Sequence, residues 1–255
     1  MEFITGAYTD VGIRKNKNQD SHSITVANTP YGKIAFAVIC DGMGGLAKGE
    51  VASSYVVGLF DRWLRTDLPN VLKNGSMQDL EYQWNEIVQS ANIKIAEYSK
   101  QFGINMGTTL TAVLLHNNKG YVVHVGDTRL YQITDSSLEI LTEDQTLVAR
   151  EVRRGNMTPE QAEADPRRNV LLQCIGASRV VVPQFLQFDF DINQTYMMCS
   201  DGFRHKVSEQ EIHKAFSPSV ISDKQVVIDN SKALVELNKS RMETDNITVL
   251  TIKTY

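Results

Sequence analysis

The side chains in this sequence that could carry out chemistry are aspartates placed at the ends of apolar segments. Asp41 follows the apolar run 34–40 and opens the glycine-rich segment 42–45, Gly-Met-Gly-Gly. Asp127 and Asp201 follow apolar runs in the same way. A carboxylate at the end of a buried strand is costly to leave unpaired. We therefore expect these carboxylates to converge on metal cations.

Two further aspartates, Asp20 and Asp245, complete a set of five that the surrounding residues single out. A site built only from carboxylates suits hard octahedral cations, so we expect magnesium or manganese. Zinc would require His and Cys at short spacing, and the five His residues are scattered. Any one of these aspartates could equally lie in an ordinary turn, so the hypothesis depends on their joint occurrence.

Two other chemistries fail on residue spacing. The Cys–Arg pairs 174–179 and 199–204 each have one residue too few between them for a thiol phosphatase. The segment Gly44–Gly49 has the glycine gap of a nucleotide-binding P-loop, but Glu50 occupies the position that requires Lys. Cysteine-dependent phosphatase chemistry and P-loop nucleotide binding are therefore excluded.

Composition narrows the class of protein further. The chain has 255 residues and a net charge of −4, without a run of Lys or Arg long enough to grip a nucleic-acid backbone. The first residues lack the basic and apolar regions of a secretory signal, and no stretch is long enough to span a membrane. Three cysteines, two of them inside apolar runs, indicate reduced core thiols. We expect a cytoplasmic protein whose partners include neither nucleic acid nor membrane.

Hydrophobic patterning predicts the elements that must position the aspartates. Strands are predicted over 2–8, 22–28, 33–40, 107–115, 120–126, 128–133, 182–188, 195–199 and 247–252. Helices are predicted over 48–65, 79–101, 208–216 and 223–239, with Pro69 and Gly75 marking a loop between the first two. Two helices followed by a strand meander favour an α+β fold over a parallel sheet.

The segment 144–180 differs from the rest because it is polar and charged. Within it, Thr158 is predicted to be a helix N-cap, with Pro159 at the first helical position and Gln161 completing a capping box. We interpret the segment as an excursion from the sheet rather than a separate domain.

The motifs around the aspartates resemble those of the metal-dependent serine/threonine protein phosphatases, the PPM or type-2C family, in its short bacterial form. The matching segments, in chain order, are 12–21, 41–45 with 49–53, 107–109, 125–129, 144–147, 166–170, 200–202 and 245–249. One such segment would be weak evidence, whereas eight in this order, running nearly end to end, are highly specific.

The resemblance implies a four-layer αββα sandwich, in which two antiparallel sheets lie between pairs of helices. It implies a single phosphatase domain over residues 1–255, with metals in a cleft at one end of the sandwich. The segment 144–180 corresponds to a mobile flap beside that cleft.

The resemblance also implies the ligands of two core metal ions. Asp41 matches the carboxylate that bridges the two ions. Asp20 and the Gly42 carbonyl match ligands of the second ion, and Asp201 and Asp245 match ligands of the first. The carboxylates Asp41, Asp201 and Asp245 are accordingly the catalytic set.

A third, weaker ion is implied at Asp127, where Asp201 also contributes. The implied reaction is hydrolysis of phosphoserine and phosphothreonine on proteins. Two divalent cations about 3.5–4 Å apart lower the pKa of a shared water and orient it in line with phosphorus. No covalent phosphoenzyme is needed, and the glycine-rich turn after Asp41 lets the backbone approach the metal closely.

The cation that meets the phosphate is open between two residues. Family spacing before Asp20 points to Lys15, whereas Arg14 lies one residue further and would offer a bidentate fork. Lys17 is interpreted as a solvated turn charge.

The source of the leaving-group proton is also open. Met43 occupies the position where animal members have His, and Met cannot donate a proton. A metal-bound water or another residue must then supply the proton. We interpret His124 and His205 as structural, and Arg129 as a salt-bridge partner that orients its neighbours.

The main hypothesis is a protein phosphatase, monomeric and opposing a cognate Ser/Thr kinase. A partner-binding pseudophosphatase would have lost metal ligands, and here all five aspartates are present. A two-metal phosphodiesterase or nuclease would need a basic groove, which the sequence does not indicate.

Overall fold

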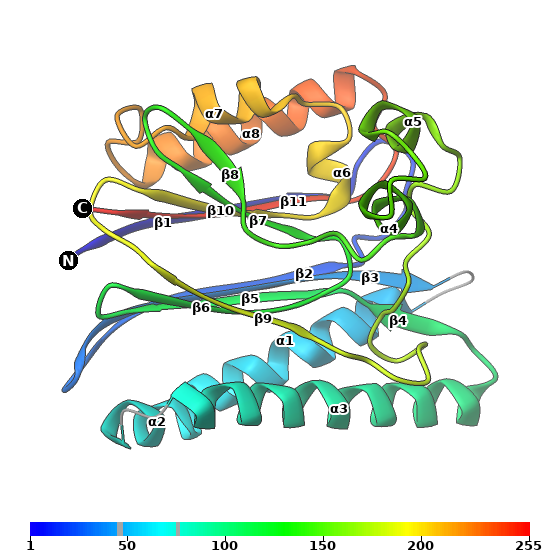
Figure 1. Cartoon of the computed structure of the whole chain (residues 1–255), viewed down its shortest axis with the longest axis horizontal. Coiled ribbons are helices and arrows are strands. Elements are labelled where there is room, and N and C mark those ends of the chain that lie inside the picture. The colour runs from blue at the N-terminus through cyan, green and yellow to red at the C-terminus, as the bar shows by residue number, and fades with distance from the viewer. Residues whose placement is uncertain (45–47, 75–76) are drawn as a thin grey trace.

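The computed structural model of the chain describes residues 1–44, 48–74 and 77–255. Its backbone forms four layers, with two antiparallel sheets face to face and helices covering their outer faces (Figure 1). The predicted α+β class and the αββα sandwich are both confirmed.

Each sheet is built from strands that are far apart in the sequence. The first sheet has the order β1-β11-β10-β7-β8, with β1 Phe3–Asp10, β7 Arg129–Ile133, β8 Leu138–Ile140, β10 Thr195–Cys199 and β11 Ile247–Thr254. The second has the order β2-β3-β5-β6-β9, with β2 Asp20–Thr29, β3 Gly32–Gly44, β5 Leu110–His116, β6 Lys119–Val125 and β9 Gln184–Asp189. The short strand β4, Met106–Thr108, pairs with the end of β3.

The helices divide between the two outer faces (Figure 1). The second sheet is covered by α1 Gly49–Thr66, α2 Leu68–Asn74 and α3 Met77–Phe102. The first sheet is covered by α7 Glu209–Phe216 and α8 Lys224–Ser240. Across the described ranges, every helix falls short of the length or hydrophobicity that a membrane span requires.

The three apolar layers of the protein form because side chains along each strand point alternately to the two faces of its sheet. In β3, Phe36 and Val38 pack against α1 and α3, whereas Ala35, Ala37 and Ile39 face the other sheet. Successive strand side chains point to opposite faces, so a fully apolar strand serves two cores at once. This explains why the run 34–40 contains no polar residue.

Some elements differ from the prediction. The expected loop at Pro69 is the short helix α2, in which Pro69 is the second residue, where a missing N–H costs nothing; Gly75 lies outside the described residues. The predicted strand 107–115 is split in two at Thr109, where the Asp41 N–H donates to the Thr109 hydroxyl at 2.9 Å instead of to the strand backbone. All three cysteines are buried and unpaired, as expected for core thiols.

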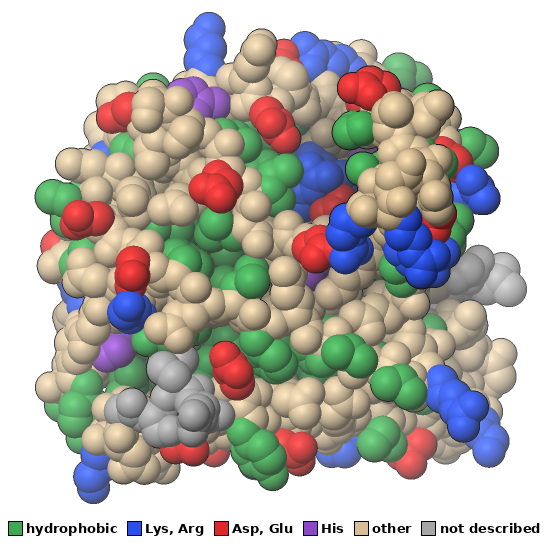
Figure 2. Space-filling view, in the orientation of Figure 1, with side chains coloured by type: hydrophobic (Ala, Val, Ile, Leu, Met, Phe, Trp, Pro, Cys, Tyr) green, Lys and Arg blue, Asp and Glu red, His purple; other side chains and the backbone are tan. Residues whose placement is uncertain are grey.

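The segment 144–180 leaves the first sheet and packs beside one end of the sandwich (Figure 1). It carries α4 Leu147–Arg153 and α5 Pro159–Ala164. The predicted capping box is present, with Gln161 N–H donating to Thr158 and the Gln161 side chain accepting from the Thr158 N–H. Figure 2 shows Lys and Arg side chains gathered around this part of the surface.

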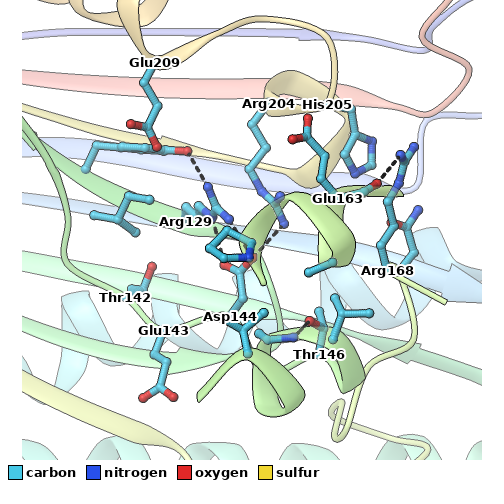
Figure 3. Close-up of a pocket in the computed structure, with 18 of the residues that line it drawn as sticks. Arg129, Thr142, Glu143, Asp144, Thr146, Glu163, Arg168, Arg204, His205 and Glu209 are labelled. Atoms are coloured by element: carbon cyan, nitrogen blue, oxygen red, sulfur yellow. Dashed lines mark hydrogen bonds and ion pairs between the residues drawn. The ribbon is translucent and has the colours of Figure 1, made fainter. Parts of the chain in front are cut away.

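A cavity of about 670 Å³ separates this segment from the helices that follow β10 (Figure 3). Its floor includes Arg129, Asp144 and Arg204, and its walls include apolar side chains of α4, α5 and α7. The cavity borders the aspartate cluster described below.

Candidate metal centre

The fold brings the strand ends that carry the five aspartates to one end of the sandwich, opposite both chain termini (Figure 1). Asp20 opens β2 and pairs directly with Asp41 near the end of β3. Asp127 follows β6, Asp201 follows β10 at the start of α6, Asp201–Arg204, and Asp245 precedes β11. In an antiparallel sheet, one strand ends where its neighbour begins. Residues far apart in the sequence therefore meet at the same end of the sheet.

The electrostatics confirm that these carboxylates share one environment. Burial raises the pKa of Asp41 well above its ordinary value, and the charges of Asp20, Asp201, Asp127 and Asp245 raise it further. Burial also raises the pKa of Asp20 to about 7 and that of Asp127 to about 7, despite favourable partners around each. Asp20, Asp41 and Asp127 are therefore hard to ionise without a compensating cation.

Asp20 is held from one side only. Its Oδ2 accepts hydrogen bonds from the Ser200 hydroxyl at 2.9 Å and the Thr248 hydroxyl at 2.6 Å. Within the described residues, Asp20 Oδ1 and Asp201 Oδ1 are buried without a hydrogen-bond partner. Buried polar atoms nearly always have partners, so these two oxygens point to a group that binds them.

Asp41 is positioned through its backbone, which leaves its carboxylate available. Its N–H donates to the Thr109 hydroxyl at 2.9 Å, and the Thr108 hydroxyl donates to its carbonyl at 3.0 Å. Both threonines therefore support the site from behind. Gly42 follows in close packing, since a Cβ there would lie 2.2 Å from the Gly49 carbonyl oxygen. Gly45, the last glycine of the motif, lies outside the described residues.

The donor set fits a hard divalent cation, although it is not preassembled. Among the described residues, no three His, Cys, Asp or Glu side chains already surround one point as a metal shell would. Ionised carboxylates repel one another, so such a cluster closes only around a cation. The two unpartnered oxygens of Asp20 and Asp201 are the donors that a cation would satisfy.

Lys15 and Arg14 are both exposed, and Lys15 reaches the cluster. Lys15 Nζ lies 2.8 Å from Asp245 Oδ1. Burial lowers the pKa of Lys15, but the hydrogen bond to Asp245 and the charges of Asp41 and Asp201 outweigh it and raise that pKa. Lys17 pairs with Glu50 at 3.0 Å and is a solvent-exposed turn charge, as expected.

Comparison with known proteins decides the family. A family model described as Protein phosphatase 2C matches residues 13–236. The chain belongs to this family. It is a protein serine/threonine phosphatase, and the resemblance drawn from the motifs is confirmed.

Similar type-2C phosphatases match along nearly the whole chain. The serine/threonine phosphatase stp of Listeria monocytogenes serotype 4b is 30% identical over 250 residues, covering 96% of this chain and 93% of that protein. The S. agalactiae serine/threonine phosphatase structure has a TM-score of 0.85 at 27% identity, and the match covers 100% of both chains. The catalytic domain of PstP, solved in complex with two manganese ions, has a TM-score of 0.79 at 28% identity over 98% of this chain and 97% of that one.

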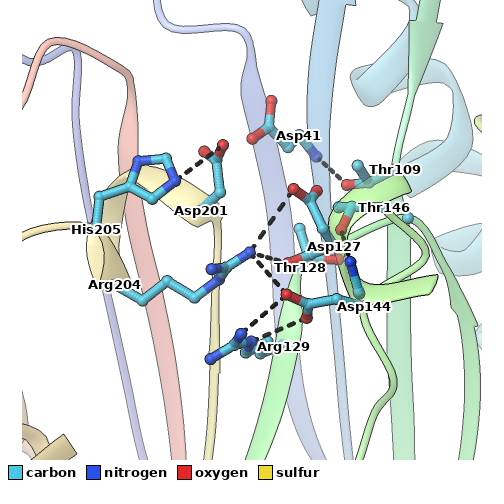
Figure 4. Close-up of polar contacts among 12 residues, drawn as sticks. Asp41, Thr109, Asp127, Thr128, Arg129, Asp144, Thr146, Asp201, Arg204 and His205 are labelled. Carbon is cyan, nitrogen blue, oxygen red and sulfur yellow. Dashed lines mark hydrogen bonds and ion pairs between the residues drawn. The ribbon is translucent and has the colours of Figure 1, made fainter. Parts of the chain in front are cut away.

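This type-2C phosphatase also has charged side chains at the site that sequence reasoning did not assign to it (Figure 4). Arg204, at the end of α6, lies 3.2 Å from Asp144 Oδ2 and 3.7 Å from Asp127 Oδ2. Arg129 binds both carboxylate oxygens of Asp144 at 2.9 Å, which agrees with its predicted orienting role. Arg204 follows Asp201 by one helical turn, and that spacing was the available signal.

The two histidines have different surroundings. His124 is buried, bonds the Thr111 hydroxyl at 2.9 Å, and has its pKa lowered to about 4 by burial, so it is structural as expected. His205 is not remote from the site: its Nε2 lies 3.5 Å from Asp201 Oδ2 and its Nδ1 lies 3.4 Å from Glu243 Oε2. His205 therefore braces a predicted metal ligand of the type-2C phosphatase.

Proposed function

We propose that this type-2C phosphatase hydrolyses phosphoserine and phosphothreonine in proteins with a water activated between two divalent cations, manganese or magnesium. The observation that carries the proposal is the pair of buried, unpartnered oxygens on Asp20 and Asp201 within a cluster of five carboxylates. The two manganese ions in the structure of the PstP catalytic domain support it.

The residues would divide the work as follows. Asp41 would bridge the two cations, with Asp20 and the Gly42 carbonyl on one side and Asp201 and Asp245 on the other. When bound, the cations would lower the pKa of a shared water and offset the charge of the phosphate dianion. Thr108 and Thr109 hold the Asp41 backbone in place, so the starting point of its side chain is fixed before substrate binds.

Lys15 is the residue that we propose for the substrate phosphate. Its ammonium group already lies among the carboxylates, 2.8 Å from Asp245. A cation bound to Asp245 would free this ammonium for a phosphate oxygen. Arg14, the other candidate, would remain at the exposed rim.

The wider setting follows from this activity. We propose a single-domain monomer with residues 144–180 as a flap over the cleft, acting on protein substrates of a cognate Ser/Thr kinase. The third, weaker ion implied at Asp127 stays a prediction, and the cation that lies beside Asp127 in the structure is Arg204.

One assay tests the proposal against its competitors. The purified chain is offered a phosphothreonine peptide, p-nitrophenyl phosphate or DNA, with manganese and then with excess chelator. We expect manganese-dependent phosphate release from the peptide, loss of release with chelator, and no cleavage of DNA. Silence on every substrate would favour a binding scaffold, and DNA cleavage would favour a nuclease.

Substitution of Asp41, the proposed bridging carboxylate, tests the same proposal by mutation. Asp41→Ala should reduce turnover by at least about 100-fold while the protein stays folded, because the site loses the ligand shared by both cations. The control is Asp189→Asn, which removes an exposed carboxylate paired with Lys119 on the second sheet. Circular dichroism checks folding, and full activity in Asp41→Ala would defeat the assignment.

A further inference from the structure

The environment of Asp127 does not match that of the other four aspartates. The Arg204 side chain is largely buried, and one of its terminal nitrogens contacts both the backbone and the side chain of Asp127 (Figure 4). Arg204 Nη2 donates to the Asp127 carbonyl at 3.1 Å and lies 3.7 Å from its carboxylate. The same nitrogen lies 3.2 Å from Asp144 Oδ2. The guanidinium is thus tied to this position by backbone and side-chain oxygens together.

The charge of Asp201 also acts on this position and raises the pKa of Asp127. With Asp201 neutralised by a core ion, the remaining charges would balance. Arg129 and Arg204 supply two positive charges, and Asp127 and Asp144 supply two negative ones. Arg129 binds both oxygens of Asp144, and Arg204 contacts the carboxylates of both Asp144 and Asp127, so the two arginines and two aspartates form one network. Arg stays protonated throughout the accessible pH range, so it supplies this positive charge in the presence or absence of metal.

A divalent ion bound to Asp127 would have to share a buried site with this fixed positive charge. Coulomb repulsion between two cations is strong where water is excluded. The guanidinium cannot deprotonate to relieve the repulsion, and moving it away would break its hydrogen bond to the Asp127 carbonyl and strain its ion pair with Asp144. The residues around Asp127 therefore fit a third metal ion poorly, in contrast to the cluster around Asp20 and Asp201.

We propose that Arg204 takes the place of the third cation, so that this phosphatase binds two metal ions and carries the third positive charge in its own chain. The inference depends on the proposed two-metal function. Asp127 is then a counter-charge for Arg204 rather than a metal ligand. The flap, which begins at Asp144, is tied to the same guanidinium, so the charge beside the core site and the anchor of the flap are one group.

The test is a count of bound metal. Full-length protein is stripped with chelator and dialysed against free Mn²⁺ from micromolar to millimolar concentration, and bound manganese is measured by mass spectrometry. We expect the wild type and Asp127→Asn to bind two ions per chain. Arg204→Gln should gain a third, weak site, and adding Asp127→Asn to Arg204→Gln should remove that site again.

Two controls separate charge from general loosening. Arg204→Lys keeps the positive charge and should bind two ions. Arg129→Gln removes the other arginine that pairs with Asp144, without uncovering Asp127, and should also bind two ions. A third ion in Arg129→Gln would contradict the proposal. Circular dichroism of each variant checks folding.

The outcomes distinguish the two proposals. If the wild type binds three ions and Asp127→Asn binds two, the role of Arg204 is wrong while the two-metal function survives. If the wild type binds no manganese, both are wrong. The wild-type and Asp127→Asn counts decide this even if Arg204→Gln does not fold.

Discussion

Single residues in the carboxylate cluster differ in how firmly they are held. Asp20 is fixed by two hydroxyl donors, and Asp41 is fixed through its backbone by Thr108 and Thr109. Asp245 instead forms an ion pair through Oδ1 with Lys15, whose side chain is 41% exposed. Rigid carboxylates on one side and an exchangeable ion pair on the other would suit the proposed site, which must admit both metal and phosphate.

The ion pair of Lys15 leads to a prediction that separates it from Arg14. Lys15→Ala should lower kcat/KM for a phosphothreonine peptide by about 10–100-fold, as expected for losing a charge-assisted hydrogen bond worth roughly 1.5–3 kcal/mol. Lys15→Arg should keep most of the activity. Arg14→Ala is the matched control and should change kcat/KM by less than about twofold; a larger loss in Arg14→Ala than in Lys15→Ala would reverse the assignment.

For single residues, the sequence predicted the aspartates of the site. It did not predict the side-chain contacts that surround them. Asp41, Asp127 and Asp201 were identifiable because each follows an apolar run, and Asp20 and Asp245 because of the motifs around them. Arg204 and His205 were not assigned to the site, because their partners Asp127, Asp144 and Glu243 come from other parts of the chain. Such contacts depend on rotamers within a folded neighbourhood, which residue spacing alone does not specify.

Among the elements, the junction between β3 and α1 is the one that the site depends on most closely. Gly42 in β3 and Gly49 at the start of α1 touch without side chains between them: a Cβ on Gly49 would lie 2.7 Å from the Gly42 carbonyl oxygen. This contact brings the Gly42 carbonyl, a predicted metal ligand, against the helix start.

A pair of glycine substitutions tests that junction. Gly42→Ala should abolish manganese-dependent turnover and lower the unfolding temperature, because its Cβ would lie 2.2 Å from the Gly49 carbonyl oxygen. Gly58→Ala lies in α1 with no atom within 4 Å of its Cβ. It should stabilise the protein by about 0.5–1 kcal/mol, the usual gain for Ala over Gly in a helix, without changing turnover. Thermal unfolding and phosphate release measure both, and an active Gly42→Ala enzyme would contradict the close-contact account.

The long elements were predictable from sequence, whereas most short ones were not; the short helix α5 was predictable because of its capping box. The helices α1, α3 and α8 and the strands of both sheet centres carry strong apolar periodicity. In contrast, β8 and α6 span only 3 and 4 residues, too few for a period to be seen. Local sequence also could not show the break between β4 and β5, since there the N–H of the distant Asp41 donates to the Thr109 hydroxyl instead of to the strand backbone.

For the whole molecule, the buried carboxylates couple metal binding to stability. With a pKa raised to about 7, Asp20 and Asp127 each keep a proton in the folded state that the unfolded state loses near its ordinary pKa. Without metal, the free energy of unfolding should therefore fall as the pH rises through about 7. Buried His124, with its pKa lowered to about 4, acts in the opposite direction only below about pH 6.5.

The predicted window is thus between about pH 6.5 and 8. Across it, the metal-free protein should lose about 1–3 kcal/mol of stability, equivalent to roughly 2–4 °C of unfolding temperature per kcal/mol for a chain of this size. Saturating Mn²⁺ should remove the loss, and Asp20→Asn should make the metal-free loss smaller. Thermal unfolding with chelator and with metal measures this, and a metal-free protein that becomes more stable over this window would contradict it.

The sandwich as a whole gathers acidic groups from both sheets at one end, and the account depends on those groups meeting around paired ions. The most direct measurement is a crystal of the full chain grown with manganese, with anomalous diffraction recorded at the manganese edge. We predict two anomalous peaks within reach of Asp20, Asp41, Asp201 and Asp245. A well-ordered site with these carboxylates turned apart and no anomalous peak between them would contradict the account.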